Sequence, residues 1–174
     1  MDVKFTQLTT PTLEIAAALN KWENDPTLLP FIHPNPREAD LVNRKPVTAD
    51  TLRERLEDRS IYLIYVDEVL VGEVNYQIDP DHLYKKEMGT AWVGINIGEE
   101  AARGKGVGAQ AMLFIEKQAR AHGLKRMELG VFEFNTNAIK LYKKMGFQEI
   151  ARIENFIFWQ GKLWPDIRME KYLK

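Results

Sequence analysis

Residues 91–123 decide the fold, because an extended apolar run, AWVGINIG (91–98), leads through a loop, EEAARGKGVG (99–108), into AQAMLFIEKQARAHG (109–123). In the last stretch apolar residues recur at helical spacing, and Gly123 supplies a common helix end. The sequence therefore predicts a central strand, a glycine-rich loop and a long helix in direct succession.

The loop has the composition of an anion-binding site. The first N–H groups of a helix lack partners within the helix, and the aligned peptide dipoles place partial positive charge there. Arg103 and Lys105 add formal charge, while glycines remove the Cβ atoms that would hold a phosphate away from the backbone. We expect a diphosphate to be bound by Arg103, Gly104, Lys105, Gly106, Val107 and Gly108.

The spacing of the loop argues against two common phosphate-binding motifs. A P-loop needs four residues between its first glycine and Gly-Lys, followed by Ser or Thr; here Gly98 and Gly104 are separated by five residues, and Gly106 stands where the hydroxyl should be. A dinucleotide fingerprint needs G-x-G-x-x-G, whereas this loop reads GKGVG. The pattern that remains is Arg103-x-x-Gly106-x-Gly108.

A second motif, VFEFNTNAIKLYKKMGF, occupies residues 131–147, with Asn135, Ala138, Tyr142 and Gly146 at fixed spacings. The two motifs, in this order, resemble the two signatures of the GNAT superfamily of N-acetyltransferases, in particular its ribosomal-protein and small-amine branch. The specific resemblance covers roughly residues 90–150, and the flanks agree with the family only in the order of their elements.

The resemblance implies an α/β fold with a mixed, twisted and mostly antiparallel sheet and helices on both faces. It also implies an enzyme, an acyltransferase that binds acetyl-CoA as cosubstrate in a cleft between two parallel central strands. The acetyl group would pass directly to a primary amine in a ternary complex, without a metal. The acceptor would be a small-molecule amine or a peptide N-terminus.

Composition sets further bounds on these expectations. A chain of 174 residues is expected to form one domain, residues 1–174, and a net charge of −1 argues against nucleic-acid binding. No apolar run is long enough to span a membrane, so we expect a cytoplasmic protein. Cysteine is absent, which excludes an acyl-cysteine intermediate.

Periodicity and turn residues predict the remaining elements. One helix is expected to be capped by Thr10 with Pro11 as its first residue, and another to be capped by Thr48 with Arg55 facing water. Strands are expected at 3–8, 61–66, 69–78, 127–132, 147–159 and 163–173, and a further helix at 136–145.

Residues 27–47 contain four of the eight prolines and show no periodicity. Long irregular segments inside a compact domain are usually functional. We therefore expect part of the acceptor pocket in this segment, with Trp22, Phe31, Trp159 and Trp164 as further candidates for its lining.

Several catalytic and cofactor roles follow from the resemblance. Tyr142 is the expected general acid, which would protonate the leaving thiolate. Asn135 would contact the cofactor from the start of the second helix, where it also suits an N-cap. Backbone N–H groups around Ile95 and Ile97 would pair with the pantetheine amides and polarise the thioester carbonyl.

The general base stays open among Glu73, Glu87 and Glu99. Trp92 stands where many relatives of this branch carry glutamate, which argues against a base at that position. We expect the three histidines, His33, His82 and His122, to be surface residues.

Two alternatives to this interpretation remain. The first is a non-catalytic acyl-CoA sensor of the same fold, although retention of Tyr142 favours the enzyme; the second is an enzyme with another acyl group or acceptor. A polyamine or aminoglycoside acceptor would need an acidic pocket, which Asp79, Asp81 and Glu87 could supply. Homodimerisation through the C-terminal strands is a further open alternative.

Overall fold

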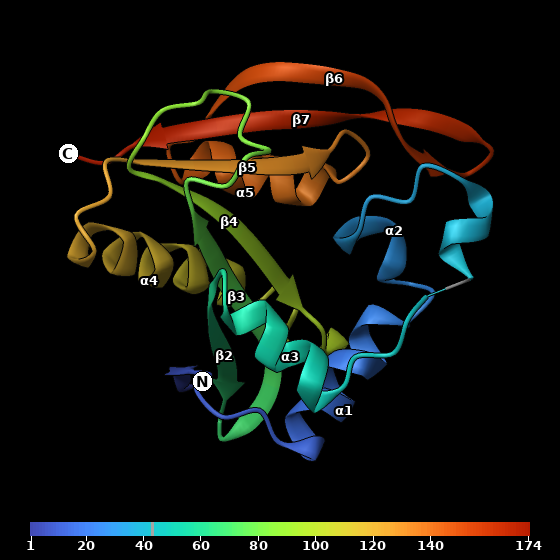
Figure 1. The fold of residues 1–174 in the computed structure, drawn as a ribbon, viewed down its shortest axis with the longest axis vertical. Coiled ribbons are helices and arrows are strands. Elements are labelled where there is room, and N and C mark those ends of the chain that lie inside the picture. Colours follow the sequence, from blue (N-terminus) through green and yellow to red (C-terminus); the bar gives the residue numbers. More distant parts are fainter. Residues whose placement is uncertain (43) are drawn as a thin grey trace.

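The computed structural model describes residues 1–42 and 44–174, and its seven strands form one sheet in the order β1-β2-β3-β4-β5-β7-β6 (Figure 1). The strands are β1 (Val3–Gln7), β2 (Ser60–Val66), β3 (Val69–Ile78), β4 (Thr90–Ile97), β5 (Arg126–Phe132), β6 (Gln148–Trp159) and β7 (Lys162–Tyr172). The helices are α1 (Leu13–Glu23), α2 (Leu29–Ile32), α3 (Ala49–Leu56), α4 (Val107–Ala121) and α5 (Thr136–Lys144). Short 3-10 turns occupy Glu38–Leu41 and Glu100–Ala102. The strand of residues 90–97 is central, as predicted.

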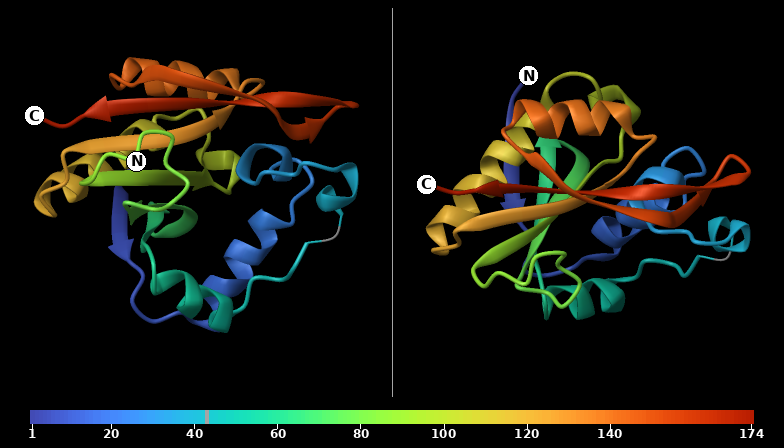
Figure 2. Two further views of the ribbon diagram at one scale, coloured as in Figure 1. Left: turned by 45° about the horizontal axis from the view of Figure 1, so that its top comes forward. Right: turned by 90° about the horizontal axis from the view of Figure 1, so that it is seen from above.

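The sheet consists of two halves that meet at the parallel pair of β4 and β5. Every other neighbouring pair is antiparallel. The pairing of β4 with β5 runs from Thr90 opposite Arg126 to Trp92 opposite Glu128. Beyond this point β4 follows β3 and β5 follows β7, so the two halves diverge toward the carboxyl ends of both central strands (Figures 1 and 2).

Helices cover both faces of the sheet, as the fold class requires. On one face, α4 and α5 pack on the sheet in a core that includes Val74, Tyr76 and the fully buried Ile115. On the other face, α1 and α3 lie side by side and bury Leu19 and Leu52 against β2 (Figure 1). The expected mixed, mostly antiparallel α/β fold is confirmed.

The alternation of β3 explains how one strand serves both a core and a site. Val74 and Tyr76 point into the α4 core, and successive side chains of a strand point to opposite faces. Glu73, Asn75 and Gln77 therefore share the other face, beneath α1 and α3. A single strand thus places three polar side chains in a row.

Two local expectations need correction. Helix α1 is capped by Thr12, whose hydroxyl oxygen accepts a hydrogen bond from the Ile15 N–H at 3.2 Å, whereas Thr10 and Pro11 precede the helix. An N-cap oxygen must lie within reach of the third helical N–H, and Thr12 satisfies this condition. The segment 27–47 is not wholly irregular, because it contains α2 and the turn Glu38–Leu41; its residue 43 lies outside the described residues.

Within the described residues, no helix has both the length and the apolar character that crossing a membrane requires.

Candidate active site

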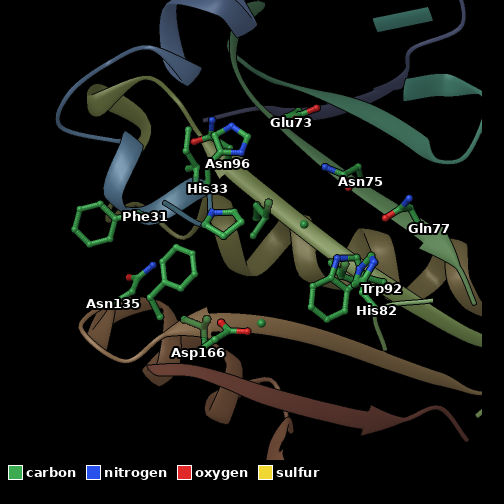
Figure 3. A pocket seen from close by; sticks show the side chains of 18 of the residues that line it. Phe31, His33, Glu73, Asn75, Gln77, His82, Trp92, Asn96, Asn135 and Asp166 are labelled. Carbon is green, nitrogen blue, oxygen red and sulfur yellow. The ribbon is translucent and has the colours of Figure 1, made fainter. Parts of the chain in front are cut away.

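A cavity of about 690 Å³ opens where β4 and β5 diverge. Its walls come from both halves of the sheet and from the segment that connects α1 with α3, including Phe31 and His33 (Figure 3). Figure 3 shows Glu73, Asn75 and Gln77 along one wall and Asp166 on the opposite side. The divergence of the two strands therefore creates a space that is open to both halves of the sheet.

The loop that the sequence singled out leads from the end of β4 into α4. Gly104 and Gly106 have φ angles of +70° and +81°, and a Cβ atom at either position would meet nothing within 4 Å. Among the described residues, the backbone N–H groups of residues 104–109 donate to no acceptor of the chain. Left-handed glycines and free N–H groups ahead of a helix form a concave anion-binding surface.

The other residues of the loop have distinct local roles. The Arg103 guanidinium donates to the carbonyl oxygens of Ile97 (2.9 Å) and Gly98 (2.6 Å), so it ties the loop to the end of β4. The side chain of Val107 is buried in the core, Lys105 is exposed, and a Cβ atom at Gly108 would lie 3.2 Å from Leu141 Cδ2. Gly108 thus permits close packing of α4 against α5.

Ile95 and Ile97 pack their side chains against the α4 core, which leaves their backbone at the diverging edge of β4. Ile95 lines the cavity. Asn135 also lines the cavity and caps α5, because its side-chain oxygen accepts a hydrogen bond from the Ala138 N–H at 3.4 Å.

Tyr142 reaches the cavity from α5. Only 8% of its surface is exposed, and burial raises the pKa of its phenol to about 12. Within the described part of the chain, its hydroxyl makes no hydrogen bond. The phenol therefore stays protonated at neutral pH, and its hydroxyl is available to a ligand.

Glu73 is the candidate base that the structure places in the cavity. Burial raises the pKa of its carboxyl to about 7, and the negative charge of Glu23 adds to this effect. Its Oε2 atom is buried and finds no hydrogen-bond partner in the part of the chain that the structure describes. A carboxylate with this pKa can take up a proton near neutral pH.

The other two candidate bases lie elsewhere and are engaged by neighbours. Glu87 accepts hydrogen bonds from the Tyr172 hydroxyl at 2.8 and 2.9 Å. Glu99 accepts from the Lys21 ammonium at 2.7 Å and from the Trp22 indole at 2.8 Å, and these hydrogen bonds lower the pKa of its carboxyl.

Two ion pairs line the cavity on opposite sides. Arg55 donates to both oxygens of Glu23, at 2.6 and 2.9 Å, although the sequence predicted that Arg55 faces water. Burial would raise the pKa of Glu23, but the nearby His33 and Arg55 outweigh it and lower the pKa to about 2. Across the cavity, Arg168 donates from Nε to Asp166 at 2.7 Å.

The histidines divide between the surface and the cavity. His122 is exposed, as expected, and bonds to the Tyr76 hydroxyl at 2.7 Å. His82 is exposed as well, but it lies edge-on against Trp92 at the rim of the cavity, where burial lowers the pKa of its ring. His33 is half-buried in the cavity wall with its Nε2 atom 3.4 Å from Glu23, so the surface prediction is wrong for this residue. Residues 1–42 and 44–174 contain no cluster of metal-binding side chains.

The aromatic expectation holds for one residue of four. Phe31 lines the cavity, with Ile32, His33 and Pro34 of the same segment. Trp22 is fully buried in the core beneath Gly98. Trp159 and Trp164 instead lie against Phe134, with ring centroids 4.1 and 5.4 Å away, and do not belong to the residues that line the cavity.

The proposed acidic residues of the loop between β3 and β4 do not line the cavity. Asp79 accepts hydrogen bonds from the N–H groups of Gly89 and Thr90, and Asp81 is exposed. The cavity carboxylates come instead from Glu23, Glu73 and Asp166. Nothing in the sequence indicated that Arg55, Arg59, Asp166 and Arg168 line the cavity, because their approach depends on tertiary packing. The alternation of the polar residues Glu73, Asn75 and Gln77, in contrast, is visible in the sequence and indicates that they share one face of a strand.

Comparison with known proteins identifies related sequences. A family model described as the acetyltransferase (GNAT) family matches residues 17–147. The chain is 33% identical over 86 residues to a spermine/spermidine N(1)-acetyltransferase of Bacillus subtilis, which covers 49% of this chain and 57% of that relative. The match thus spans little more than half the length of the relative.

Solved structures share the whole architecture. A ribosomal-protein-alanine N-acetyltransferase from Brucella melitensis superposes with a TM-score of 0.75 at 17% identity, covering 98% of this chain and 99% of that one. A spermidine N-acetyltransferase from Vibrio cholerae, solved with CoA and spermine, gives 0.75 at 17% identity over 98% and 95%. At 17% identity, these two comparisons show a shared fold and nothing about the substrate.

Proposed function

The chain belongs to the acetyltransferase (GNAT) family, and from this premise we propose that it transfers an acetyl group from acetyl-CoA directly to a primary amine. Residues 1–174 would act as one N-acetyltransferase domain, in a ternary complex of enzyme, acetyl-CoA and amine. The observation that carries the proposal is the cavity between β4 and β5, which Glu73 and Tyr142 both line. A group suited to accept a proton and a group suited to donate one thus face the same space.

Acetyl-CoA would supply the thioester, and the chain offers a fitting surface for it. The free N–H groups of residues 104–109 would hold its diphosphate, since the positions of the missing Cβ atoms of Gly104 and Gly106 are open. Asn135 and the backbone around Ile95 and Ile97 would bind the pantetheine arm. Two proteins of the same fold support this assignment, because one from Salmonella typhimurium was solved with acetyl-CoA and the one from Vibrio cholerae with CoA.

Glu73 would remove one proton from the substrate ammonium, and the freed nitrogen would then attack the thioester carbonyl carbon. Backbone N–H groups at the edge of β4 would stabilise the negative charge on the carbonyl oxygen. The carbon–sulfur bond breaks, and Tyr142 would donate its proton to the departing sulfur. The second nitrogen proton, lost as the amide forms, would restore the Tyr142 phenol.

Thiol release from acetyl-CoA, measured over a panel of primary amines, tests the proposal. We expect turnover with at least one amine class and the acetylated amine as its product. Coenzyme binding without thiol release from any amine would instead support the non-catalytic sensor.

A further inference from the structure

The charged groups of the cavity indicate which amines fit it, and this inference rests on the proposed function. Among residues 1–42 and 44–174, the charged side chains that line the cavity are three acidic and three basic ones: Glu23, Glu73, Asp166, Arg55, Arg59 and Arg168. The formal charges of these six side chains cancel. The cavity therefore lacks the acidic excess that would attract a substrate with several positive charges.

Two of the carboxylates are already neutralised by arginines. Arg55 holds Glu23 through two hydrogen bonds, and Arg168 holds Asp166 at 2.7 Å. Arg168 also donates to the His82 carbonyl oxygen at 3.0 Å. A second ammonium group in the cavity would have to displace one of these arginines, which leaves a buried charge without its partner.

The remaining pair is Glu73 and Arg59, and these two residues are not bonded to each other. Arg59 donates from Nε to Asp58 at 2.9 Å, and Asp58 in turn accepts from the Gln77 amide at 3.0 Å. In the part of the chain that the structure describes, the two terminal nitrogens of Arg59 donate to no protein acceptor. The hydrogen bond from Nε to Asp58 thus holds the Arg59 side chain in place, while its terminal nitrogens remain available to a ligand in the cavity.

The sheet sets the separation between these two groups. Ser60, the first residue of β2, pairs with Tyr76. Arg59 precedes Ser60 and therefore lies near Gln77, which is four residues along β3 from Glu73. Four residues of strand span about 13 Å between Cα atoms. Both side chains nevertheless line the same cavity, and the charge of Arg59 acts to lower the pKa of Glu73. Asn75 lies between Glu73 and Gln77 on the same face of β3 (Figure 3).

We propose that the acceptor is a small amine that also carries a carboxylate several bonds away, with its amine at Glu73 and its carboxylate on Arg59. A guanidinium binds a carboxylate through two parallel hydrogen bonds, which fixes both position and orientation. A polyamine would bring a distal ammonium to Arg59 instead, where like charges repel. The substrate class therefore differs from that named for the Bacillus subtilis relative.

Three six-carbon acceptors that differ at the far end test this inference: 6-aminohexanoate, hexylamine and 1,6-diaminohexane, with a four-carbon set beside them. We expect kcat/KM, measured by thiol release, to be about tenfold or more higher for the carboxylate than for the diamine. Arg59→Gln should remove the preference, and Arg59→Lys should retain part of it. Arg53→Gln is the matched control, because Arg53 lies exposed on α3 and pairs with Asp50 away from the cavity.

A preference for the diamine, or a preference for the carboxylate that Arg59→Gln leaves intact, would overturn the inference while the acetyl transfer itself stands. Absence of thiol release from every amine would overturn the proposed function and the inference together. Thermal unfolding of each variant verifies that it is folded before its preference is interpreted.

Discussion

Tyr142 and Glu73 have opposite protonation properties although they line the same cavity. Burial raises both pKa values, which keeps the phenol protonated and brings the pKa of the carboxyl to about 7. Two groups whose environments separate their roles in this way are typical of acid and base pairs.

We expect Tyr142→Phe to lower kcat by about 10²-fold and to leave the KM for acetyl-CoA nearly unchanged. Within the described residues the hydroxyl makes no hydrogen bond, so its removal should change the free energy of unfolding little. Steady-state kinetics measure both constants, with Tyr84→Phe as the control at an exposed tyrosine outside the cavity. Unchanged kcat would remove Tyr142 from the mechanism.

We expect kcat/KM of the wild type to rise with pH through about 7, the pKa of Glu73, since a base acts in its deprotonated form. Glu73→Gln should lose this limb and at least about 10²-fold in rate. Glu87→Gln, at an exposed residue outside the cavity, should leave the profile unchanged. A profile of wild-type shape in Glu73→Gln would exclude this residue as the base.

Stability gives an independent view of the same group. The pKa of Glu73 is 4.5 in the unfolded chain and about 7 in the fold, so the folded state keeps a proton that the unfolded state has lost between these values. The free energy of unfolding therefore falls as pH rises from about 4.5 to 7. Glu73→Gln should therefore raise the free energy of unfolding by about 1–2 kcal/mol near pH 8 and by almost nothing near pH 4, measured by urea unfolding. The expected gain is smaller than the full pKa shift would give, because water in the cavity screens the charge.

The family resemblance indicated one residue, Tyr142, as the general acid, whereas three candidates for the base stayed open. Tyr142 could be named because it belongs to a motif that is continuous in the sequence. Which of Glu73, Glu87 and Glu99 is buried and unpaired depends on contacts between distant segments, such as the approach of Tyr172 to Glu87. The pairing of Arg55 with Glu23 was hidden for the same reason.

At the scale of elements, the loop between β4 and α4 is the proposed binding site for the diphosphate of the coenzyme. It is predictable from sequence because glycines in the left-handed region and a following apolar helix are local features. The divergence of β4 and β5 was expected from the family resemblance alone. Periodicity cannot give it, since strand pairing depends on residues far apart in the chain.

We expect Gly106→Val to raise the dissociation constant of coenzyme A at least about tenfold, because the side chain strains the left-handed backbone and occupies the anion-binding surface. Gly161→Val is the matched control: Gly161 has a φ of +77° and the same open surroundings, in the turn between β6 and β7. Isothermal titration measures affinity, and thermal unfolding compares the strain in the two variants. Equal affinities in both variants would contradict the role of the loop.

At the scale of the whole molecule, two half-sheets are joined by a short parallel pairing and by the shared core of α4 and α5. A ligand held by the loop before α4 and by residues of α5 would connect both halves. At a coenzyme A concentration near 100 times its dissociation constant, we expect about 2.7 kcal/mol of stabilisation. For a chain of this length the melting temperature should rise by about 5–10 °C, measured by scanning calorimetry.

Pantetheine is the control for this effect, because it lacks the diphosphate. It should stabilise the protein much less than coenzyme A at equal concentration. An equal shift with both compounds would show that the diphosphate contributes little to binding.

A crystal structure of the chain with acetyl-CoA would show whether the loop before α4 binds the coenzyme. We expect diphosphate oxygens within hydrogen-bond distance of the N–H groups of residues 104–109, and the sulfur next to the Tyr142 hydroxyl. Coenzyme bound elsewhere on the chain, with this loop free of phosphate, would refute the proposed site.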